Sequence, residues 1–205
     1  MAGWPARVGI IFIVLAVVGG VGVAVGPGAD VVDGGITWLV NSTDTALGGS
    51  ATTESTPAPA TAASDLERAV HKRVNEARMT RNLDPLDFDG ELREIARFHS
   101  RDMAERGYFS HLSPDGADFS DRYDRFGYEC HVQTGPATYA TGGENLFRIR
   151  GASGLSDANV ADRAVAGWLD SPSHRRNLLH PDWRREGIGV ARAEGGSIYI
   201  TQNFC

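Results

Sequence analysis

The sequence is poor in cysteine and lacks the short motifs that mark the common enzyme classes. Its 205 residues include two cysteines, too few for a disulfide-rich scaffold or a four-cysteine zinc site. It contains no His-Glu-x-x-His helix, Gly-x-Ser-x-Gly turn, phosphate-binding loop or Cys-x-x-Cys pair. These absences exclude the standard signatures of zinc proteases, serine hydrolases, nucleotide-binding proteins and thiol oxidoreductases.

Positive charge is also scarce. Lys72 is the only lysine, and the formal net charge is −6 at pH 7. A nucleic-acid-binding protein needs a basic stripe or patch, so we expect no nucleic-acid partner. The balance of 41% apolar and 22% charged residues is instead typical of a globular protein.

One long apolar run stands near the N-terminus. Residues 8–25 are 18 consecutive apolar residues, which as a helix extend about 27 Å, close to the thickness of a hydrocarbon core. Arg7 precedes the run and Asp30 follows it, and a positive flank tends to stay on the cytoplasmic side. We predict that residues 1–29 form a signal anchor; the alternative is a signal peptide cleaved near Gly26. Both alternatives place the rest of the chain outside the cytoplasm.

A low-complexity linker follows this segment. Residues 30–64 are rich in Ser, Thr, Ala, Pro and Gly, most strongly from residue 42 onward. Such a composition buries too little apolar surface to offset the conformational entropy lost on ordering. We therefore expect a tether that holds the following domain, residues 65–205, near the membrane.

Helical periodicity dominates the first part of that domain. Ser64 and Glu67 form a capping box, and the apolar pattern after them predicts a helix to about Arg81. The same kind of pattern predicts three more helices, over residues 89–107, 121–126 and 156–169.

Alternation with a period of two replaces the helical pattern near the C-terminus. It predicts two strands, over residues 187–191 and 197–201, and a further strand over residues 144–147. The remainder of residues 128–156 is rich in glycine, and we expect it to be irregular. Helices followed by a terminal hairpin indicate an α+β fold, in which helices cover a small sheet.

Three polar residues beside predicted helix ends and turns could carry chemistry. His111 follows the second helix, Glu144 lies in a Gly-Gly-Glu-Asn segment, and His174 follows the fourth helix. Sequence distance does not show whether these side chains meet, and each could serve as a capping or hydrogen-bonding residue. His99 lies on an apolar helix face and is expected in the core. The other histidines are expected at the surface: His71, His131 and His180.

The order of several segments resembles the CAP superfamily, which includes the cysteine-rich secretory proteins, antigen 5 and plant pathogenesis-related proteins, and above all its bacterial and archaeal branch. The matching segments are VNEARMTRNLDPLDFDGELREIARFHSRDMAERGYFSH, GGENL, VAGWLDSPSHRRNLLHPDWRREGIGVA and YITQNF, and together they span essentially residues 65–205. The resemblance implies an α-β-α sandwich with a central open cleft. In it a small, mainly antiparallel sheet lies between helical layers, here preceded by one N-terminal membrane helix.

In that family, two histidines and acidic residues converge on the cleft. His111 and His174 match the histidines, and Glu144 matches the Glu of the Gly-Glu-Asn segment, next to Asn145. Asp170 could replace a second Glu of the eukaryotic members, although its position is shifted by one residue. Several relatives bind zinc or another divalent metal through the two histidines. The resemblance thus implies a metal site at His111 and His174 within a ligand-binding cleft.

The favoured function is a binding or interaction module outside the membrane, whose cleft takes a small-molecule, lipid, peptide or protein ligand. The alternative is a hydrolase in which His111 or His174 is the general base and Glu144 is its orienting partner. Ser110 and Ser173 are candidate nucleophiles, but neighbouring side chains usually point apart, so an intact triad is not expected. A third interpretation is a structural spacer in the cell envelope.

The two cysteines, Cys130 and Cys205, have no spacing typical of a metal site. Export places them in a compartment where disulfides persist, so we predict an intramolecular Cys130–Cys205 bond. The alternatives are two free thiols or a bond between chains.

Overall fold

The computed structural model describes residues 29–30, 40–42 and 64–205. The predicted membrane helix and most of the predicted linker lie outside these residues. Within the described ranges, no helix combines the length and the apolar character needed to cross a membrane.

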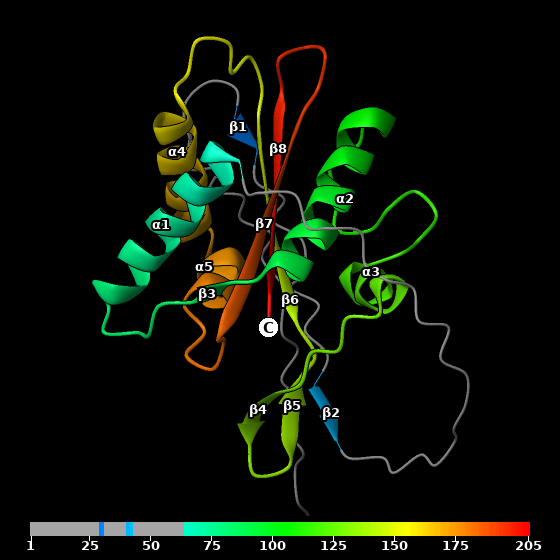
Figure 1. The fold of residues 1–205 in the computed structure, drawn as a ribbon, viewed down its shortest axis with the longest axis vertical. Helices are drawn as coiled ribbons and strands as arrows, with labels where there is room; N and C mark the ends of the chain where they lie inside the picture. Colours follow the sequence, from blue (N-terminus) through cyan, green and yellow to red (C-terminus); the bar gives the residue numbers. More distant parts are fainter. Residues whose placement is uncertain (1–28, 31–39, 43–63) are drawn as a thin grey trace, which may run out of the picture.

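A five-stranded sheet forms the centre of the domain (Figure 1). Neighbouring strands run antiparallel, except that β3 and β7 are parallel. In spatial order the strands are β1 (Ala29–Asp30), β6 (Gly143–Ile149), β8 (Ile198–Phe204), β7 (Arg185–Arg192) and β3 (Asp87–Phe88). The predicted C-terminal hairpin is confirmed as β7 and β8, and each strand is longer than the alternating pattern indicated.

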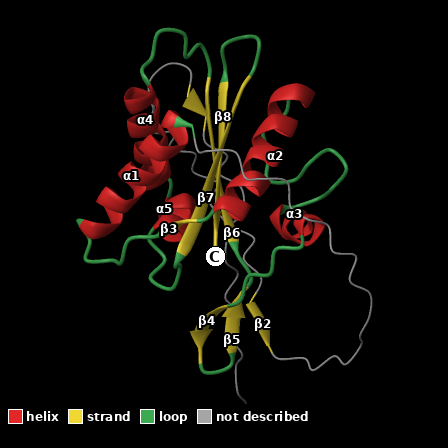
Figure 2. Cartoon of the chain, in the orientation of Figure 1, coloured by secondary structure: helices red, strands yellow, loops and turns green. Residues whose placement is uncertain are grey.

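A second, three-stranded sheet lies beyond one end of the first, at the bottom of Figure 2. Its antiparallel strands are, in spatial order, β2 (Val40–Ser42), β5 (Thr138–Ala140) and β4 (Val132–Gly135). The expectation that residues 128–143 are irregular is therefore wrong for β4 and β5. Both strands are short and mostly half-buried, so their sequences lack the alternation that marks a strand.

The described residues contain five helices, which lie on the two sides of the central sheet (Figure 2). The helices on one side are α1 (Asp65–Met79), α4 (Asp157–Asp170) and α5 (Pro172–Leu178). Those on the other side are α2 (Gly90–Arg106) and α3 (Phe119–Phe126). The predicted mixed α+β fold is confirmed.

The helix ends follow from local sequence. The capping box of Ser64 and Glu67 is present, and α1 ends at Met79, two residues before the predicted end. Gly107 ends α2 in the left-handed conformation, with φ of 70°, which glycine adopts without a steric penalty. Helix α5 was not predicted, because it begins directly after α4 with only Ser171 between them.

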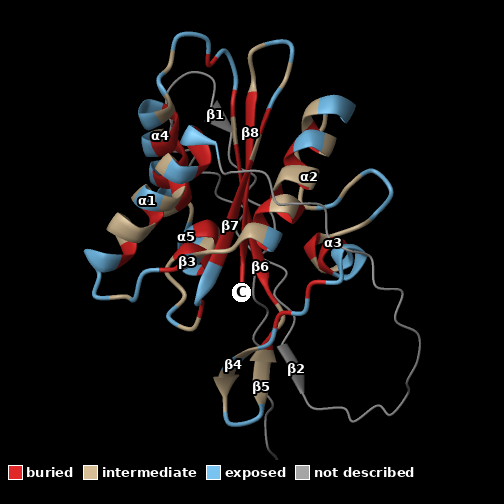
Figure 3. Cartoon of the chain, viewed as in Figure 1, coloured by how far each residue is buried: buried red, intermediate tan, exposed pale blue. Residues whose placement is uncertain are grey.

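Glycines allow α2 to pack closely on β7. A Cβ atom at Gly189 would lie 2.0 Å from the backbone nitrogen of Arg97, and one at Gly187 would lie 2.2 Å from that of Arg93. Any side chain at these two positions would push α2 away from the sheet. The strands between the helical layers are almost entirely buried (Figure 3).

The predicted disulfide between Cys130 and Cys205 is confirmed, with the two Cα atoms 5.6 Å apart. Both cysteines are buried, next to Tyr128 and Leu92. The bond joins the segment after α3 to the residue that follows the central strand β8.

The surface expectation was wrong for two of the histidines. His71 Nδ1 lies 2.6 Å from Oε1 of the fully buried Glu186, so His71 is a half-buried partner of a core carboxylate. His180 is also half-buried, with its ring centroid 5.1 Å from that of Trp183, and burial lowers its pKa. His131 is exposed, as expected.

Candidate functional site

Glu144 is the buried centre of the candidate site. It lies at the start of β6, and its side chain is only 1% exposed. Arg122 of α3 donates from Nη2 to Glu144 Oε2 at 2.7 Å, and His111 Nδ1 lies 2.9 Å from Glu144 Oε1. The carboxylate therefore joins β6, α3 and the loop after α2.

The charge on Glu144 is maintained by its neighbours. Burial alone would raise the pKa of this carboxyl group, but Arg122, His99 and His111 more than offset burial and lower the pKa to about 2. Glu144 is therefore ionised at neutral pH and can only accept hydrogen bonds. Because Oε1 accepts from His111 Nδ1, the neutral His111 ring carries its proton on Nδ1 and leaves Nε2 as an acceptor.

The two predicted histidines meet. The rings of His111 and His174 are stacked, with centroids 6.1 Å apart and planes at 23°. His111 comes from the loop after α2, whereas His174 lies in the first turn of α5. His174 is buried, and 13% of the His111 side chain is exposed, so a ligand in solution reaches the pair through His111.

Side chains from β6, from α5 and from the residue between α4 and α5 hold His174 in place. Its Nδ1 lies 2.8 Å from Ser171 Oγ, one turn earlier in the chain. Asn145 of β6 donates to the backbone carbonyl of His174 at 3.3 Å, and Asn177 of α5 donates to the side-chain oxygen of Asn145 at 3.2 Å. These bonds connect the start of α5 to β6 and so fix the distance between the two histidines.

His99 forms a second layer behind Glu144. It is fully buried, as predicted, and its Nε2 lies 3.0 Å from the carbonyl oxygen of Ser110 and 3.9 Å from Glu144 Oε1. Burial lowers the pKa of His99 to about 4. His99 is thus neutral at pH 7, and Arg122 is the main positive charge beside the carboxylate.

A chain of buried hydrogen bonds continues from this site across the strands, on one face of the sheet. Asn145 donates to Gln202 Oε1 at 3.0 Å, and Gln202 donates to Glu186 Oε2 at 2.6 Å. The other oxygen of Glu186 contacts His71 on α1. The polar path therefore runs along one face of the sheet, from His174 on α5 to the partly exposed His71 on α1.

The structure does not bring all of the predicted cleft residues together. Asp170 is exposed at the end of α4, and its side chain makes no hydrogen bond or ion pair with the described residues. Asn145 lies on the face of β6 opposite Glu144 and acts behind His174. The hydroxyl that contacts His174 Nδ1 belongs to Ser171, which was not one of the candidate nucleophiles, Ser110 and Ser173.

The donor set limits how a metal could be held. Among the residues that the structure describes, no three His, Cys, Asp or Glu side chains are grouped so that they could bind one ion. Both oxygens of Glu144 are engaged by Arg122 and His111. A divalent ion would therefore rest on the two imidazoles, with Glu144 orienting His111 as carboxylates orient metal-binding histidines.

Sequence reasoning missed Arg122, Ser171 and Asn177. Arg122 reaches Glu144 from 22 residues away, a contact that no local pattern encodes. A weak signal did exist for Ser171, because Ser followed by Pro is typical of a helix start.

Comparison with known sequences identifies a family. A sequence profile of the cysteine-rich secretory protein family, CAP, matches residues 71–204. That range includes His111, Glu144, His174 and the segments that carry the resemblance.

Two relatives from Bacillus subtilis (strain 168) are similar over most of this chain. The uncharacterized protein YkwD is 34% identical over 152 residues, which are 74% of this chain and 51% of the relative. The uncharacterized membrane protein YlbC is 35% identical over 138 residues, which are 67% of this chain and 34% of the relative. The chain thus spans about half and about a third of the length of these relatives.

Solved structures share the fold. An extracellular protein containing an SCP domain, from Bacillus anthracis str. Ames, superposes with a TM-score of 0.52 and 29% identity, over 68% of this chain and 39% of that one. An outer surface protein from Borrelia burgdorferi superposes with a TM-score of 0.53 and 21% identity, over 68% of this chain and 91% of that one.

Proposed function

The chain belongs to the CAP family, and from that premise we propose that it is a membrane-tethered protein of the cell exterior whose CAP domain binds a ligand at the His111–His174 pair. The observation that carries the binding proposal is the stacking of these two rings, 6.1 Å apart, over the buried Glu144. A rigid pair of imidazoles with one ring partly exposed suits recognition of a metal ion or of a polar group on a small molecule, lipid or peptide.

The proposed location rests on the sequence and is supported by relatives. Residues 8–25 are long enough and apolar enough to cross a membrane, and a positive residue precedes them. One relative is named as a membrane protein, and one similar structure is of an extracellular protein. The Cys130–Cys205 bond fits an oxidising compartment.

Binding is favoured over hydrolysis because the acid and the hydroxyl contact different imidazoles of the pair. Glu144 orients His111, whereas the hydroxyl of Ser171 contacts the other ring of the pair, His174. A triad needs the hydroxyl and the acid on the same imidazole. The alternative function, hydrolysis with Ser171 and His174, rests on their 2.8 Å contact alone.

A divalent metal would be held by this chain through His111 and His174. Bound there, it would act as a Lewis acid toward a ligand oxygen. Glu144 would keep the Nδ1 proton of His111 in place, so that Nε2 faces the ion. Two imidazoles give modest affinity that falls as the histidines become protonated.

The binding proposal is tested by zinc titration of the full chain in detergent, monitored by calorimetry at pH 7. The wild type should bind about one ion, and the H111A/H174A double variant should bind none. The control is H131A, which removes an exposed histidine outside the site and should bind zinc as the wild type does. Equal zinc binding by the wild type and the double variant would end the metal proposal.

The hydrolase alternative has its own test. A panel of peptides and esters is offered to the full chain, to E144A and to S171A. Turnover that is lost in both variants would replace the binding proposal with hydrolysis, whereas turnover that both retain would come from a contaminant.

The location is tested by fractionating cells that express the full chain. The protein should sediment with membranes, retain its N-terminus, and be digested by protease added to intact spheroplasts. A mature chain that begins after Gly26 and occurs free in the medium would show that the segment is a cleaved signal peptide.

A further inference from the structure

The outer edge of β7 is only partly paired. Arg185 and Cys205, the residue after β8, exchange both of their backbone hydrogen bonds. Bonded pairs alternate along an antiparallel ladder, so residues 187, 189 and 191 also bond to β8. Residues 188, 190 and 192 therefore direct their N–H and C=O groups toward the opposite edge.

Strand β3 covers only the beginning of that opposite edge. It pairs with β7 at Arg185 and Glu186, and the N–H of Asp89 then donates to Glu186 O. Beyond this point, no backbone group in the described part of the chain bonds to the outward groups of Val190 and Arg192. An unpaired strand edge is a template on which another strand can add.

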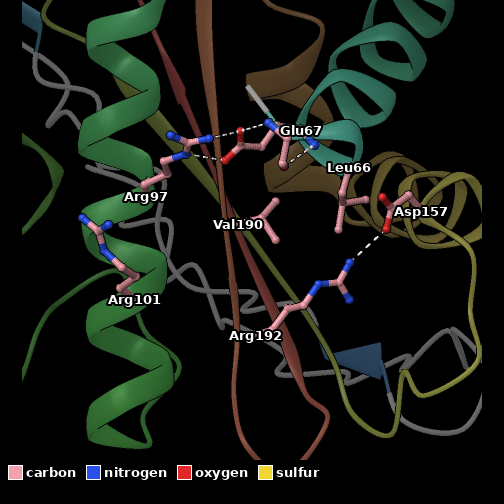
Figure 4. A pocket seen from close by; sticks show the side chains of 8 residues that line it. Leu66, Glu67, Arg97, Arg101, Asp157, Val190 and Arg192 are labelled. Atoms are coloured by element: carbon pink, nitrogen blue, oxygen red, sulfur yellow. Dashed lines mark hydrogen bonds and ion pairs between the residues drawn. The ribbon is translucent and has the colours of Figure 1, made fainter. Parts of the chain in front are cut away.

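A cavity of about 320 Å³ lies against this free edge. Figure 4 looks at the edge of β7, with α2 on one side and the N-terminal end of α1 on the other. Val190 lies at the centre of the cavity. The Arg97–Glu67 ion pair, with contacts of 2.6 and 2.7 Å, lies on one side of Val190, and the Arg192–Asp157 pair, at 2.9 Å, lies on the other.

The cavity carries an excess of positive charge. Its lining includes Arg97, Arg101 and Arg192 but only two acidic residues, Glu67 and Asp157, each of which pairs with one arginine. Arg101 is exposed and has no hydrogen-bond or ion-pair partner among the described residues. Its side chain lies along α2 in Figure 4 and can rotate toward the opening.

We propose that this edge groove, formed by Val190–Arg192 of β7 between α1 and α2, binds an extended acidic peptide segment that adds to the sheet as a further strand. Backbone bonds to Val190 and Arg192 supply affinity, and Arg101 selects a carboxylate on the peptide. The groove is separated from the His111–His174 pair by β8 and β6, so the proposal does not depend on the function proposed above.

The experiment uses the full chain in detergent and a fluorescein-labelled, amidated peptide, Thr-Glu-Val-Glu-Val-Glu-Thr. Fluorescence anisotropy should show saturable binding, and hydrogen exchange should slow at the amides of Val190 and Arg192. A peptide in which lysine replaces every glutamate should bind at least ten-fold more weakly. Unchanged exchange at both amides would overturn the proposal.

Two pairs of variants separate the backbone contribution from the charge. V190P removes the outward N–H without removing a bond to β8 and should weaken binding at least ten-fold, whereas V190A keeps that N–H and should bind as the wild type does. R101Q should weaken binding about two- to five-fold. R176Q removes another exposed arginine, on α5, and should leave binding unchanged.

A modified peptide keeps the test decisive even if V190P does not fold. N-methylation of alternate amides leaves the charge unchanged but blocks strand addition, so this peptide should not bind the wild type. If it binds as well as the parent, and inorganic phosphate displaces both, the groove is a simple anion site and the proposal is wrong.

Discussion

Glu144 is the residue on which the candidate site depends, because its two oxygens serve different partners. Oε2 pairs with Arg122, and Oε1 orients His111. We predict that E144Q lowers the free energy of unfolding by about 3 kcal/mol, because it leaves Arg122 buried without its counter-charge. The measurement is urea unfolding at pH 7.

The control for this variant is E105Q, which removes an exposed carboxylate from α2 and should change stability by less than about 0.5 kcal/mol. A similar small change in E144Q would show that Arg122 and Glu144 contribute no net stability as a pair.

His99 makes the folded state sensitive to acid. Burial lowers its pKa from 6.5 to about 4, so between these values the unfolded chain binds a proton that the folded chain does not. The free energy of unfolding should therefore fall by about 3 kcal/mol as the pH falls from 7 to 4. Glu144, with its pKa lowered to about 2, adds a further loss between about pH 4.5 and 2.

The test is the urea midpoint measured from pH 7 to pH 4. H99Q should flatten this profile, and H131Q, which changes an exposed histidine, should leave the profile of the wild type intact. An equally steep profile for H99Q would assign the acid sensitivity to other groups.

At the scale of elements, the packing of α2 on β7 depends on glycine. A Cβ at Gly189 would lie 2.0 Å from Arg97 N and 2.1 Å from Ala96 C, both of which are backbone atoms that cannot turn aside. We predict that G189A destabilises the fold by about 3 kcal/mol, near the upper end for overpacking. Chemical unfolding measures the loss.

Gly195, in the turn between β7 and β8, provides a matched control. A Cβ there meets no heavy atom within 4 Å, and its φ lies in no region that excludes side chains. G195A should therefore be nearly neutral. If G189A is equally neutral, the close approach of α2 and β7 is not required.

The helices with strong end signals were predictable, and those without were not. Ser64, Asp89 and Gly127 cap the ends of α1, α2 and α3, as their sequence positions indicated. Helix α5 has no side-chain hydrogen bond at its N-cap and follows α4 directly, so only the Ser171–Pro172 pair marked its start. Strands β4 and β5 carry no buried alternation and gave no signal.

The candidate site was predictable only in part, because several of its contacts join residues that are distant in sequence. His111, Glu144 and His174 stood out as polar residues beside predicted helix ends and turns, and the family resemblance implied that they converge. The structure brings them together. The contacts of Arg122 and His99 with Glu144 join elements that are distant in sequence, and no local spacing determines such contacts. Asp170 illustrates the opposite error. Its position in the sequence suggested a cleft residue, but its side chain faces solvent in the fold.

At the scale of the whole molecule, one covalent bond joins parts of the chain that are 75 residues apart, Cys130 and Cys205. The chain-entropy estimate for a loop of this length is about 4 kcal/mol. We predict that reduction lowers the free energy of unfolding by about this amount, which urea unfolding with and without dithiothreitol would measure.

The C130S/C205S variant is the control, because it should match the reduced wild type and show no response to dithiothreitol. A loss well below 1 kcal/mol on reduction would mean that noncovalent contacts alone hold the segment after α3 against the sheet.

The position of β8 in the sheet has a consequence for when the protein can fold. β8 is the last element of the domain in the chain, yet it lies at the centre of the sheet and pairs with both β6 and β7. While residues 198–204 are still being synthesised, those two strands have no shared partner, and the five-stranded sheet is incomplete. The hydrophobic core between the helical layers can therefore close only once this final strand has arrived, so the domain folds after its synthesis is complete and not stepwise along the chain.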